Sequence, residues 1–315
     1  MDTPILTPVT AGYAKCIEAS KKVRWDIDKD VIRGRTFDYT KKFIPDKLAR
    51  MELFGFANAD EKRLISQVQG RTYANMFAMV ERFVTAKMIE ISRSHTLGDQ
   101  NALEALVRFA DEELKHQELF RRIERMIAIG MPAGYRFVPR ANDVAWIVLG
   151  KSTWAVLALT SMVELVTQAH YRESIAPDPN LSELYKDIFF YHWREESQHA
   201  VLDELEWRRE NERLSPRARD EAVNDLIALF GAFDGVARQQ SQADAAGFLS
   251  MLKRPLPPPQ RDALQAALLR AYRWQYILSG AQDERFANLL AELTTEEQGR
   301  RIAAALEPLA QAARR

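Results

Sequence analysis

Apolar residues recur at three- and four-residue spacings over long stretches of the chain, which is the periodicity of amphipathic helices. The pattern predicts four long helices, separated by Gly and Pro residues that stop helices, over residues 58–94, 99–129, 143–174 and 182–211. Helices of about 30 residues are each about 45 Å long. Helices of this length pack as a bundle, so we expect an all-α fold built on a four-helix bundle.

Less regular segments flank these four stretches. Residues 1–45 show no sustained period, and we expect them to wrap the bundle surface. A fifth helix is expected to end near Gln240, and the Pro-rich tract 253–259 reads as a stiff connector. Two further helices are expected beyond it, over 260–279 and 294–312. The chain is thus divided into a surface-wrapping segment, the bundle with its fifth helix, and a C-terminal part: 1–45, 46–252 and 253–315.

The amino-acid composition excludes several classes of protein. A chain of 315 residues that is 47% hydrophobic can bury a large core, and its 44 basic and 44 acidic residues give no field that recruits nucleic acid or anionic lipid. The single Cys16 excludes an intramolecular disulfide, and no signal peptide or uninterrupted apolar span is evident. We therefore expect a cytoplasmic protein without a membrane or nucleic-acid partner.

Two of the predicted helices carry the same motif. Glu113-x-x-His116 and Glu196-x-x-His199 are separated by 83 residues, and Glu81 and Glu164, each inside an apolar stretch of another helix, share that offset. Residues three apart lie on one helix face, so each Glu and its His can converge on one ion. One Glu from each of two helices and a Glu-x-x-His from each of the other two form the ligand set of di-iron and di-manganese bundles.

Two other interpretations of these residues need weighing. Most Glu-x-x-His sequences are solvated surface charges, but Glu81 and Glu164 occupy positions where the helical period requires an apolar residue. Four buried glutamates without a cation would be very costly, so metal binding is favoured and should add stability. Glu112 and Glu195 are also spaced to ligate; we favour the later Glu of each pair and assign the earlier one to the surface or to orienting a ligand.

The repeat is broken at one position. His192 lies four residues before Glu196 and shares its helix face, whereas the equivalent residue in the first half is Phe109. We count His192 as a seventh ligand, so that one metal could have two imidazoles and the other one. Asp203, on the same face, is expected to accept a hydrogen bond from an imidazole. The two remaining histidines, His95 and His170, are assigned structural or surface roles, although His170 could face a substrate channel.

With the extra His before the last Glu-x-x-His, this set resembles the ferritin-like di-iron oxygenases of the p-aminobenzoate N-oxygenase type over about residues 45–240. The resemblance implies that the seven residues bind two iron ions that activate O2, with electrons from an external donor. It further implies oxidation of a small substrate such as an arylamine. The ligands would be Glu81, Glu113, His116, Glu164, His192, Glu196 and His199. Manganese and mixed manganese–iron centres use the same ligand types.

Other polar residues share the helix face of Glu164. Thr160, Thr167 and Tyr171 could line a pocket or hold carboxylates in place, and helix packing is the commoner role of such a Tyr. Alternative functions are another oxidase of this fold (desaturase-like, ribonucleotide-reductase-small-subunit-like or ferroxidase) and a non-catalytic iron-binding protein. The long flanking segments favour an enzyme, and a homodimer is one further expectation.

Overall fold

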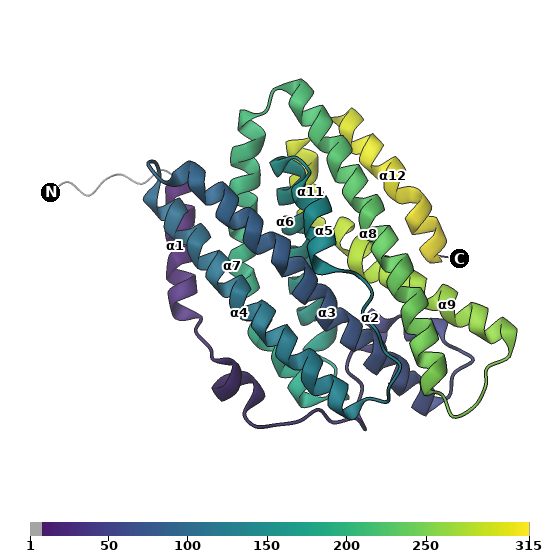
Figure 1. Ribbon diagram of the computed structural model, residues 1–315. Helices are drawn as coiled ribbons and strands as arrows, with labels where there is room; N and C mark the ends of the chain where they lie inside the picture. Colours follow the sequence, from purple (N-terminus) through teal and green to yellow (C-terminus); the bar gives the residue numbers. More distant parts are fainter. Residues whose placement is uncertain (1–7, 315) are drawn as a thin grey trace.

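The computed structural model describes residues 8–314, which fold into helices joined by short connections and form no β-strand (Figure 1). Four long elements make the central layer: α3 (Ala59–Ser92), α4 (Gln100–Gly130), α6 (Thr153–His170) and α7 (Glu183–Arg213). α3 packs along α4, and α6 packs along α7. The predicted all-helical class is therefore confirmed for this part of the chain.

Local sequence signals fix where the first two long helices begin. The side chain of Asn58 accepts a hydrogen bond from the Glu61 amide and the Glu61 carboxylate accepts one from the Asn58 amide, which closes a capping box before α3. The Asp99 carboxylate caps α4 by accepting from the next two free amides, those of Asn101 and Ala102. Both helices agree with the predicted bounds to within two residues.

The predicted third helix is wrong in its first part. The chain forms α5 (Ala141–Leu149), breaks at Gly150, and resumes as α6. Asp225 of α8 holds the break, because its carboxylate accepts from the Ser152 amide at 2.9 Å and pairs with the Lys151 ammonium at 3.1 Å. This contact joins residues far apart in the sequence, so helical periodicity could not reveal it.

The N-terminal part, which shows no sustained period and was expected to wrap the bundle surface, is more regular than its sequence indicates. Within the described residues it contains α1 (Pro8–Lys22), which packs against α4 and α7 and buries Tyr13, Cys16 and Ile17. A π-helical turn, η1 (Ile27–Ile32), follows. The helix is short, and its mixture of Ala, Gly and Lys hid its apolar face from a search for long periods.

On the opposite flank, α8 (Pro216–Met251) continues eleven residues beyond its predicted end, and α9 (Pro258–Arg273) turns back along it after the Pro-rich connector (Figure 1). One helix of the C-terminal part, α11 (Glu284–Leu293), was not predicted. The remaining elements are α2 (Asp46–Ala49), η2 (Met51–Leu53), η3 (Arg93–His95), η4 (Tyr171–Ile175), η5 (Trp274–Leu278), α10 (Ser279–Ala281) and α12 (Glu296–Arg314).

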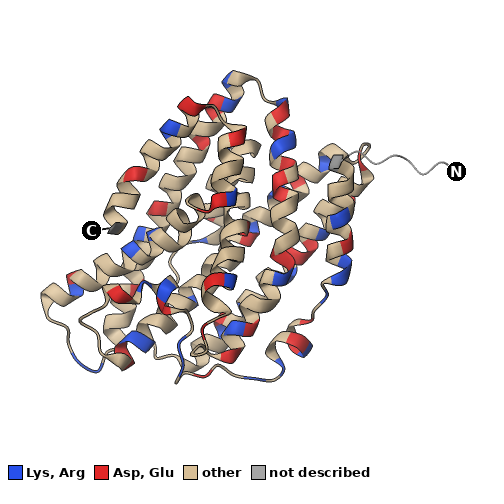
Figure 2. Ribbon diagram, turned by 180° about the vertical axis from the view of Figure 1, so that it is seen from behind, with Lys and Arg blue, Asp and Glu red and all other residues tan. Residues whose placement is uncertain are grey.

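Charged residues of both signs are interspersed along the helices, as the balanced composition implies (Figure 2). Among the described residues, no helix combines the length and apolarity needed to cross a lipid bilayer.

One glycine marks a close approach between the bundle and the segment before it. A Cβ atom at Gly70 of α3 would lie 2.6 Å from Cβ of Phe43, and the Gly70 carbonyl accepts a hydrogen bond from the Tyr185 hydroxyl. We expect Gly70→Ala to lower the free energy of unfolding by about 1–3 kcal/mol, because the backbone there cannot move aside. The matched control is Gly231→Ala on an exposed face of α8, where a Cβ meets nothing within 4 Å.

Gly231→Ala should be neutral or stabilising by about 0.4–1 kcal/mol, because it restricts only the unfolded chain. Denaturant unfolding measures both variants. Equal stability of the two would show that α3 does not approach Phe43 as closely as described.

Candidate metal centre

All seven predicted ligands are buried in the central layer, and each is at most 4% exposed. They come from all four long helices: Glu81 from α3, Glu113 and His116 from α4, Glu164 from α6, and His192, Glu196 and His199 from α7. The helical spacing that predicted them places them at one level of the bundle, where the helices face one another.

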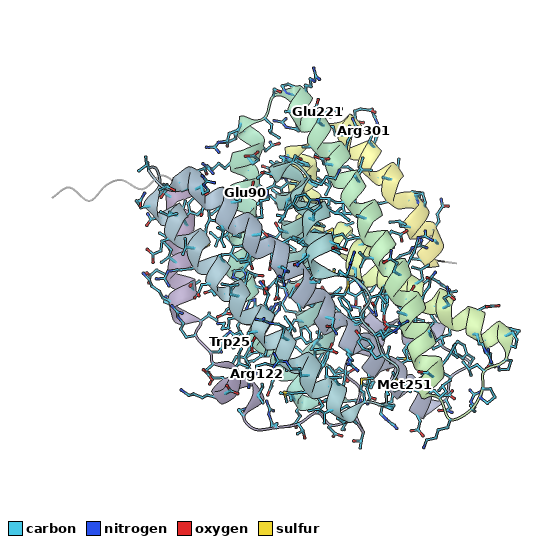
Figure 3. The ribbon with its side chains drawn as sticks, in the orientation of Figure 1. Trp25, Glu90, Arg122, Glu221, Met251 and Arg301 are labelled. Atoms are coloured by element: carbon cyan, nitrogen blue, oxygen red, sulfur yellow. The ribbon has the colours of Figure 1, made fainter. Side chains whose placement is uncertain are left out.

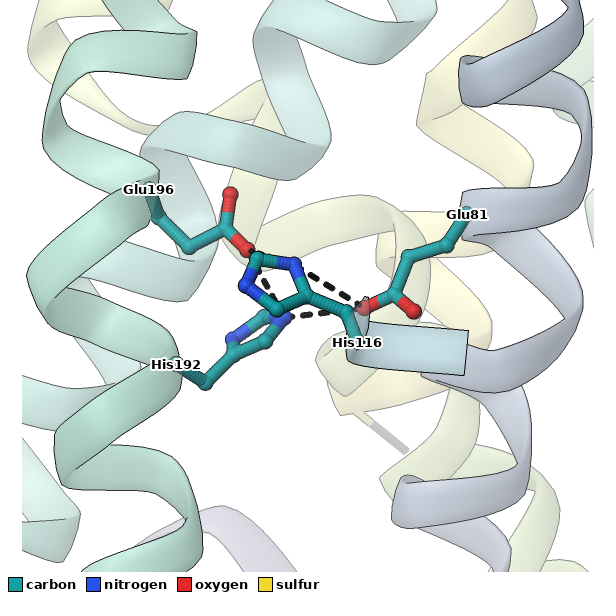
Figure 4. A group of neighbouring side chains, drawn as sticks. All are labelled: Glu81, His116, His192 and Glu196. Carbon is teal, nitrogen blue, oxygen red and sulfur yellow. Dashed lines mark hydrogen bonds and ion pairs between the residues drawn. The ribbon is translucent and has the colours of Figure 1, made fainter. Parts of the chain in front are cut away.

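The nitrogen and oxygen atoms of six of these residues form two overlapping groups whose members lie within 4.8 Å of one another. The first group is Glu81, His116, His192 and Glu196, and the second is Glu113, His116, Glu196 and His199. Figure 4 shows the first group, with Glu81 reaching from one side and Glu196 and His192 from the facing helix. Because Glu196 and His116 belong to both groups, the cluster has the form of two adjoining cation sites.

Distances within the cluster are those of a compact centre. Nε2 of His192 lies 2.9 Å from Oε1 of Glu81 and 2.7 Å from Oε1 of Glu196. On the other side, Nδ1 of His199 lies 3.1 Å from Oε1 of Glu113 and 3.0 Å from Oε2 of Glu196. The two oxygens of Glu196 therefore face different groups, as expected for a carboxylate that bridges two ions.

Several buried polar atoms of the cluster lack a hydrogen-bond partner, which indicates whether a cation would fit between them. Both carboxylate oxygens of Glu113, Oε2 of Glu81 and Nδ1 of His116 are buried and have no hydrogen-bond partner in the described part of the chain. In folded proteins most buried polar atoms have a hydrogen-bond partner, and an ionised carboxylate left alone in a protein interior is strongly disfavoured. Hard oxygen donors together with imidazole nitrogens suit iron or manganese, so the residues fit a metal centre.

The pKa values of the buried glutamates reflect the excess of negative charge within the cluster. Burial raises the pKa of Glu81 to about 8, and burial together with the charges of Glu196 and Glu113 raises that of Glu164 well above its ordinary value. The pKa of Glu196 is well below its usual range, because the charges of His192 and His199 outweigh its burial. Protons thus compensate charge at the positions where a metal ion would bind.

Glu164 is the one predicted ligand outside the two groups. It lies on α6 facing the cluster, where its carboxyl group interacts with that of Glu196. A side chain with two rotatable bonds before its carboxyl group can move toward a neighbouring cation, so the position is compatible with ligation.

Two carboxylates outside the cluster hold the imidazoles. Oε2 of Glu195 lies 2.8 Å from Nε2 of His116, and Oε2 of Glu112 lies 2.9 Å from Nε2 of His199. Each pair joins α4 to α7, so each helix orients the histidine of the other. Such a hydrogen bond fixes the tautomer of a ligand and leaves its other nitrogen free for the metal. Of the two roles considered for Glu112 and Glu195, the geometry therefore favours orienting the ligands.

The residues that contact the two orienting carboxylates also follow the 83-residue repeat, but one of them is charged and the other is neutral. Nζ of Lys115 lies 2.5 Å from Oε1 of Glu195, and Nε2 of Gln198, at the equivalent position in the second half, lies 2.6 Å from Oε2 of Glu112. The hydroxyl of Ser20 on α1 also donates to Glu112, at 2.6 Å. One orienting carboxylate is thus neutralised by a cation and the other is held by neutral groups.

Phe109 and His192 occupy equivalent positions in the two halves of the repeat, but their rings contact different histidines. The ring of Phe109 stacks on His199 with centroids 3.8 Å apart, whereas His192, at the equivalent position, lies 4.5 Å from the ring of His116. The outer face of His116 is covered instead by the indole of Trp25, which is parallel to it to within 6° at 5.9 Å (Figure 3 labels Trp25).

The residues predicted around the ligands have varied surroundings. Asp203 is buried, with a pKa raised well above its ordinary value by burial, and lies beside the Thr160 hydroxyl. It contacts no imidazole nitrogen; the nitrogens it was expected to bind are held by Glu112 and Glu195. Thr167 donates to the Val163 carbonyl within α6.

Three more predicted residues pack away from the ligands. Tyr171 stacks on the indole of Trp193 with centroids 4.8 Å apart, in line with a packing role. His95 and His170 are both buried, which excludes the surface alternative: His95 contacts Glu206 at 2.9 Å, and His170 contacts the Tyr73 hydroxyl at 2.9 Å.

Sequence reasoning missed several residues that support the centre. Ser20 and Trp25 lie in the segment without a periodic signal, so nothing in the sequence marked them. Lys115 and Gln198 did carry a signal, because they are separated by the same 83 residues as the ligands.

No protein-family model matches the chain, and no curated protein is similar to it in sequence. The resemblance to the N-oxygenase type of di-iron protein therefore rests on the ligand residues alone.

Removing an orienting carboxylate tests its role directly. We expect Glu195→Gln and Glu112→Gln each to weaken metal affinity by about 10–100-fold, because the imidazole exchanges a charge-assisted hydrogen bond to a carboxylate for a weaker one to a neutral amide. Competition with a chromophoric chelator measures the affinity. Glu118→Gln on α4 is the control, since that side chain is 42% exposed and pairs with Arg121 on the same helix. Affinities equal to that of the control would remove both carboxylates from the centre.

Proposed function

We propose that this protein is an oxidoreductase with two metal ions, most simply two irons, which activates O2 to oxidise a small organic substrate. The observation that carries the proposal is the pair of adjoining Glu/His groups that share Glu196 and His116 inside a helical bundle. Two bound ions would offset the charge of the buried carboxylates, and reduced iron supplies the electrons for O2 activation. Manganese or a mixed manganese–iron pair would use the same residues.

The protein's own residues would perform four tasks around these ions. Glu196 would bridge the two positions, while Glu81 and Glu113 would each complete one of them. Glu195 and Glu112 orient the imidazoles of His116 and His199, respectively. Apolar and aromatic residues on all four helices exclude bulk water from the cluster. Lys115 places a positive charge beside one half of the centre only.

The residues also support a narrower proposal. A ferritin-like bundle with an extra histidine before the last Glu-x-x-His resembles the p-aminobenzoate N-oxygenase type, so the proposed reaction is oxidation of an amine nitrogen, with an arylamine as the first substrate to test. Such a reaction needs an external electron donor to reduce the metals. We further propose that the protein works as a homodimer.

Metal loading tests the proposal as a whole. Protein treated with Fe²⁺ without O2 should hold two irons per chain, and its Tm should rise, because the ions bind the folded state alone and relieve repulsion among buried carboxylates. Elemental analysis and calorimetry measure the two quantities. A chain that retains fewer than one metal after loading would falsify the assignment.

Exposure of the loaded protein to O2 then separates oxidation from storage. Stoichiometric conversion of an arylamine, followed by mass spectrometry, indicates an oxygenase. Ferric iron that accumulates far beyond two per chain without substrate turnover indicates an iron-binding protein.

His192 provides a sharper test, because it is the residue that breaks the repeat. We expect His192→Ala to retain two metals, since the other six ligands remain, but to react with O2 at a rate changed by about tenfold or more. Stopped-flow absorption after mixing with O2 measures the rate. His192→Phe copies the first half of the repeat and serves as the matched variant. If both variants react as the unmodified protein does, His192 is not a ligand.

A further inference from the structure

An apolar cavity of about 40 Å³ lies between α3 and α6, the two helices that supply only carboxylates to the centre. Its wall includes Phe77 and Val80, which flank Glu81, and Val163, which precedes Glu164. The ring of Phe77 also contacts the imidazole of His192 edge-on, with centroids 5.0 Å apart. The cavity is therefore separated from the metal centre by one layer of side chains.

Two polar atoms on residues of this wall have no partner. The hydroxyl of Tyr276 and Oε1 of Gln275 are buried and accept or donate no hydrogen bond within the described residues. The orientation of the Gln275 amide is fixed, because its Nε2 donates to two carbonyl oxygens, that of Leu48 at 2.7 Å and that of the Gln69 side chain at 2.9 Å. Oε1 is thus left as a pure acceptor.

These atoms define the chemistry of a matching ligand. Burial raises the pKa of Tyr276 well above its ordinary value, so its hydroxyl keeps its proton at neutral pH and can donate. A group that both donates, to Gln275, and accepts, from Tyr276, would satisfy both atoms, and a hydroxyl or an uncharged amine is the smallest such group on a ring. The aromatic faces of Tyr73, Phe77 and Phe233 around it favour a flat apolar ring.

Part of the cavity wall is shared with a larger space at the surface. A surface cleft of about 720 Å³ shares two wall residues with it, Val166 and His170. His170 is held in place by the Tyr73 hydroxyl at 2.9 Å and by that of Ser279 at 3.1 Å, whereas Val166 is an apolar side chain without such ties. Movement of Val166 would join the two spaces. The closed cavity is smaller than the roughly 150 Å³ that holds a benzene ring in another protein, so a ring enters only after such movement.

Charge at the cleft favours ligands that are not anions. Five acidic and three basic side chains line the cleft. Each of the three basic groups forms an ion pair with a carboxylate that also lines the cleft. The acidic residues are Glu173, Glu204, Asp283, Glu284 and Glu292. A carboxylate-bearing substrate would meet net repulsion there, and within the cavity it would find no cation.

We propose that the cavity between α3 and α6 binds a small, uncharged single-ring molecule through a hydroxyl or amino group held by Gln275 and Tyr276. The C-terminal turn η5, which carries both residues, would then determine specificity. The proposal rests on the proposed function for its link to oxidation, but binding itself needs neither metal nor O2.

The test uses the full chain and three ring probes: phenol, toluene and benzoate. Dissociation constants measured by ligand-observed NMR on metal-free protein should show phenol binding about tenfold more tightly than toluene, and benzoate more weakly than either. Tyr276→Phe removes one unpartnered hydroxyl, so it should fold normally. It should weaken phenol binding about tenfold and leave toluene unchanged.

Tyr39→Phe is the matched control. Its hydroxyl donates outside the cavity, to the carbonyls of Met126 and Ile127, so phenol affinity should stay unchanged. The proposal is overturned if phenol does not bind, if benzoate binds as well as phenol, or if Tyr276→Phe keeps the full preference for phenol over toluene, which would mean that the Tyr276 hydroxyl does not hold the ligand.

A second measurement separates this proposal from the metal assignment. In protein loaded with Co²⁺, bound phenol should show paramagnetic relaxation of its protons. Phenol that binds through Tyr276 to a protein without metal affinity would leave the cavity assignment standing and remove the proposed function. Metal loading with no ring binding would do the reverse.

Discussion

The burial of carboxylates and imidazoles at the centre of the bundle is the constraint on which the rest of the structure depends. Glu81, Glu113, Glu164 and Glu196 are all removed from water, and burial raises the pKa values of Glu81 and Glu164 so that these two hold protons in place of a cation. Such a cluster is stable only in a rigid frame that supplies opposite charge at fixed points. Long helices meet this need, since each satisfies its own backbone and presents side chains at a regular spacing.

The internal repeat explains how the frame is built and where it departs from symmetry. Ligands, orienting carboxylates and the residues behind them all recur after 83 residues, so the two halves hold each other's histidine in the same way. Two of the departures from the repeat affect the centre: His192 takes the position of Phe109, and Gln198 that of Lys115. Both changes lie on or next to the centre, and both make its two halves electrically different. Two ions bound by these residues, as proposed, would have unequal surroundings, which is one physical basis for unequal tasks.

Segments outside the repeat divide the surroundings of the centre into two sides. On the side of α4 and α7, α1 and Trp25 cover the imidazoles, and Ser20 adds a hydrogen bond to Glu112. On the side of α3 and α6, the C-terminal turn η5 closes a small apolar cavity with unpartnered polar atoms. The side of α4 and α7 is filled by side chains that hold the imidazoles in place, whereas the side of α3 and α6 keeps a small cavity.

The sequence by itself indicated most of the long helices and the residues of the Glu/His cluster, because both follow from local rules: a period of 3.6 residues places Glu81 on an apolar face, and a spacing of three joins Glu113 to His116. It could not decide between Glu112 and Glu113 as ligands, since a helix presents both within one turn. Only packing against α7 turned Glu112 toward His199. The break at Gly150, the helix at Pro8–Lys22 and the cavity at Tyr276 were also decided by tertiary structure, because each depends on contacts between residues far apart in the chain.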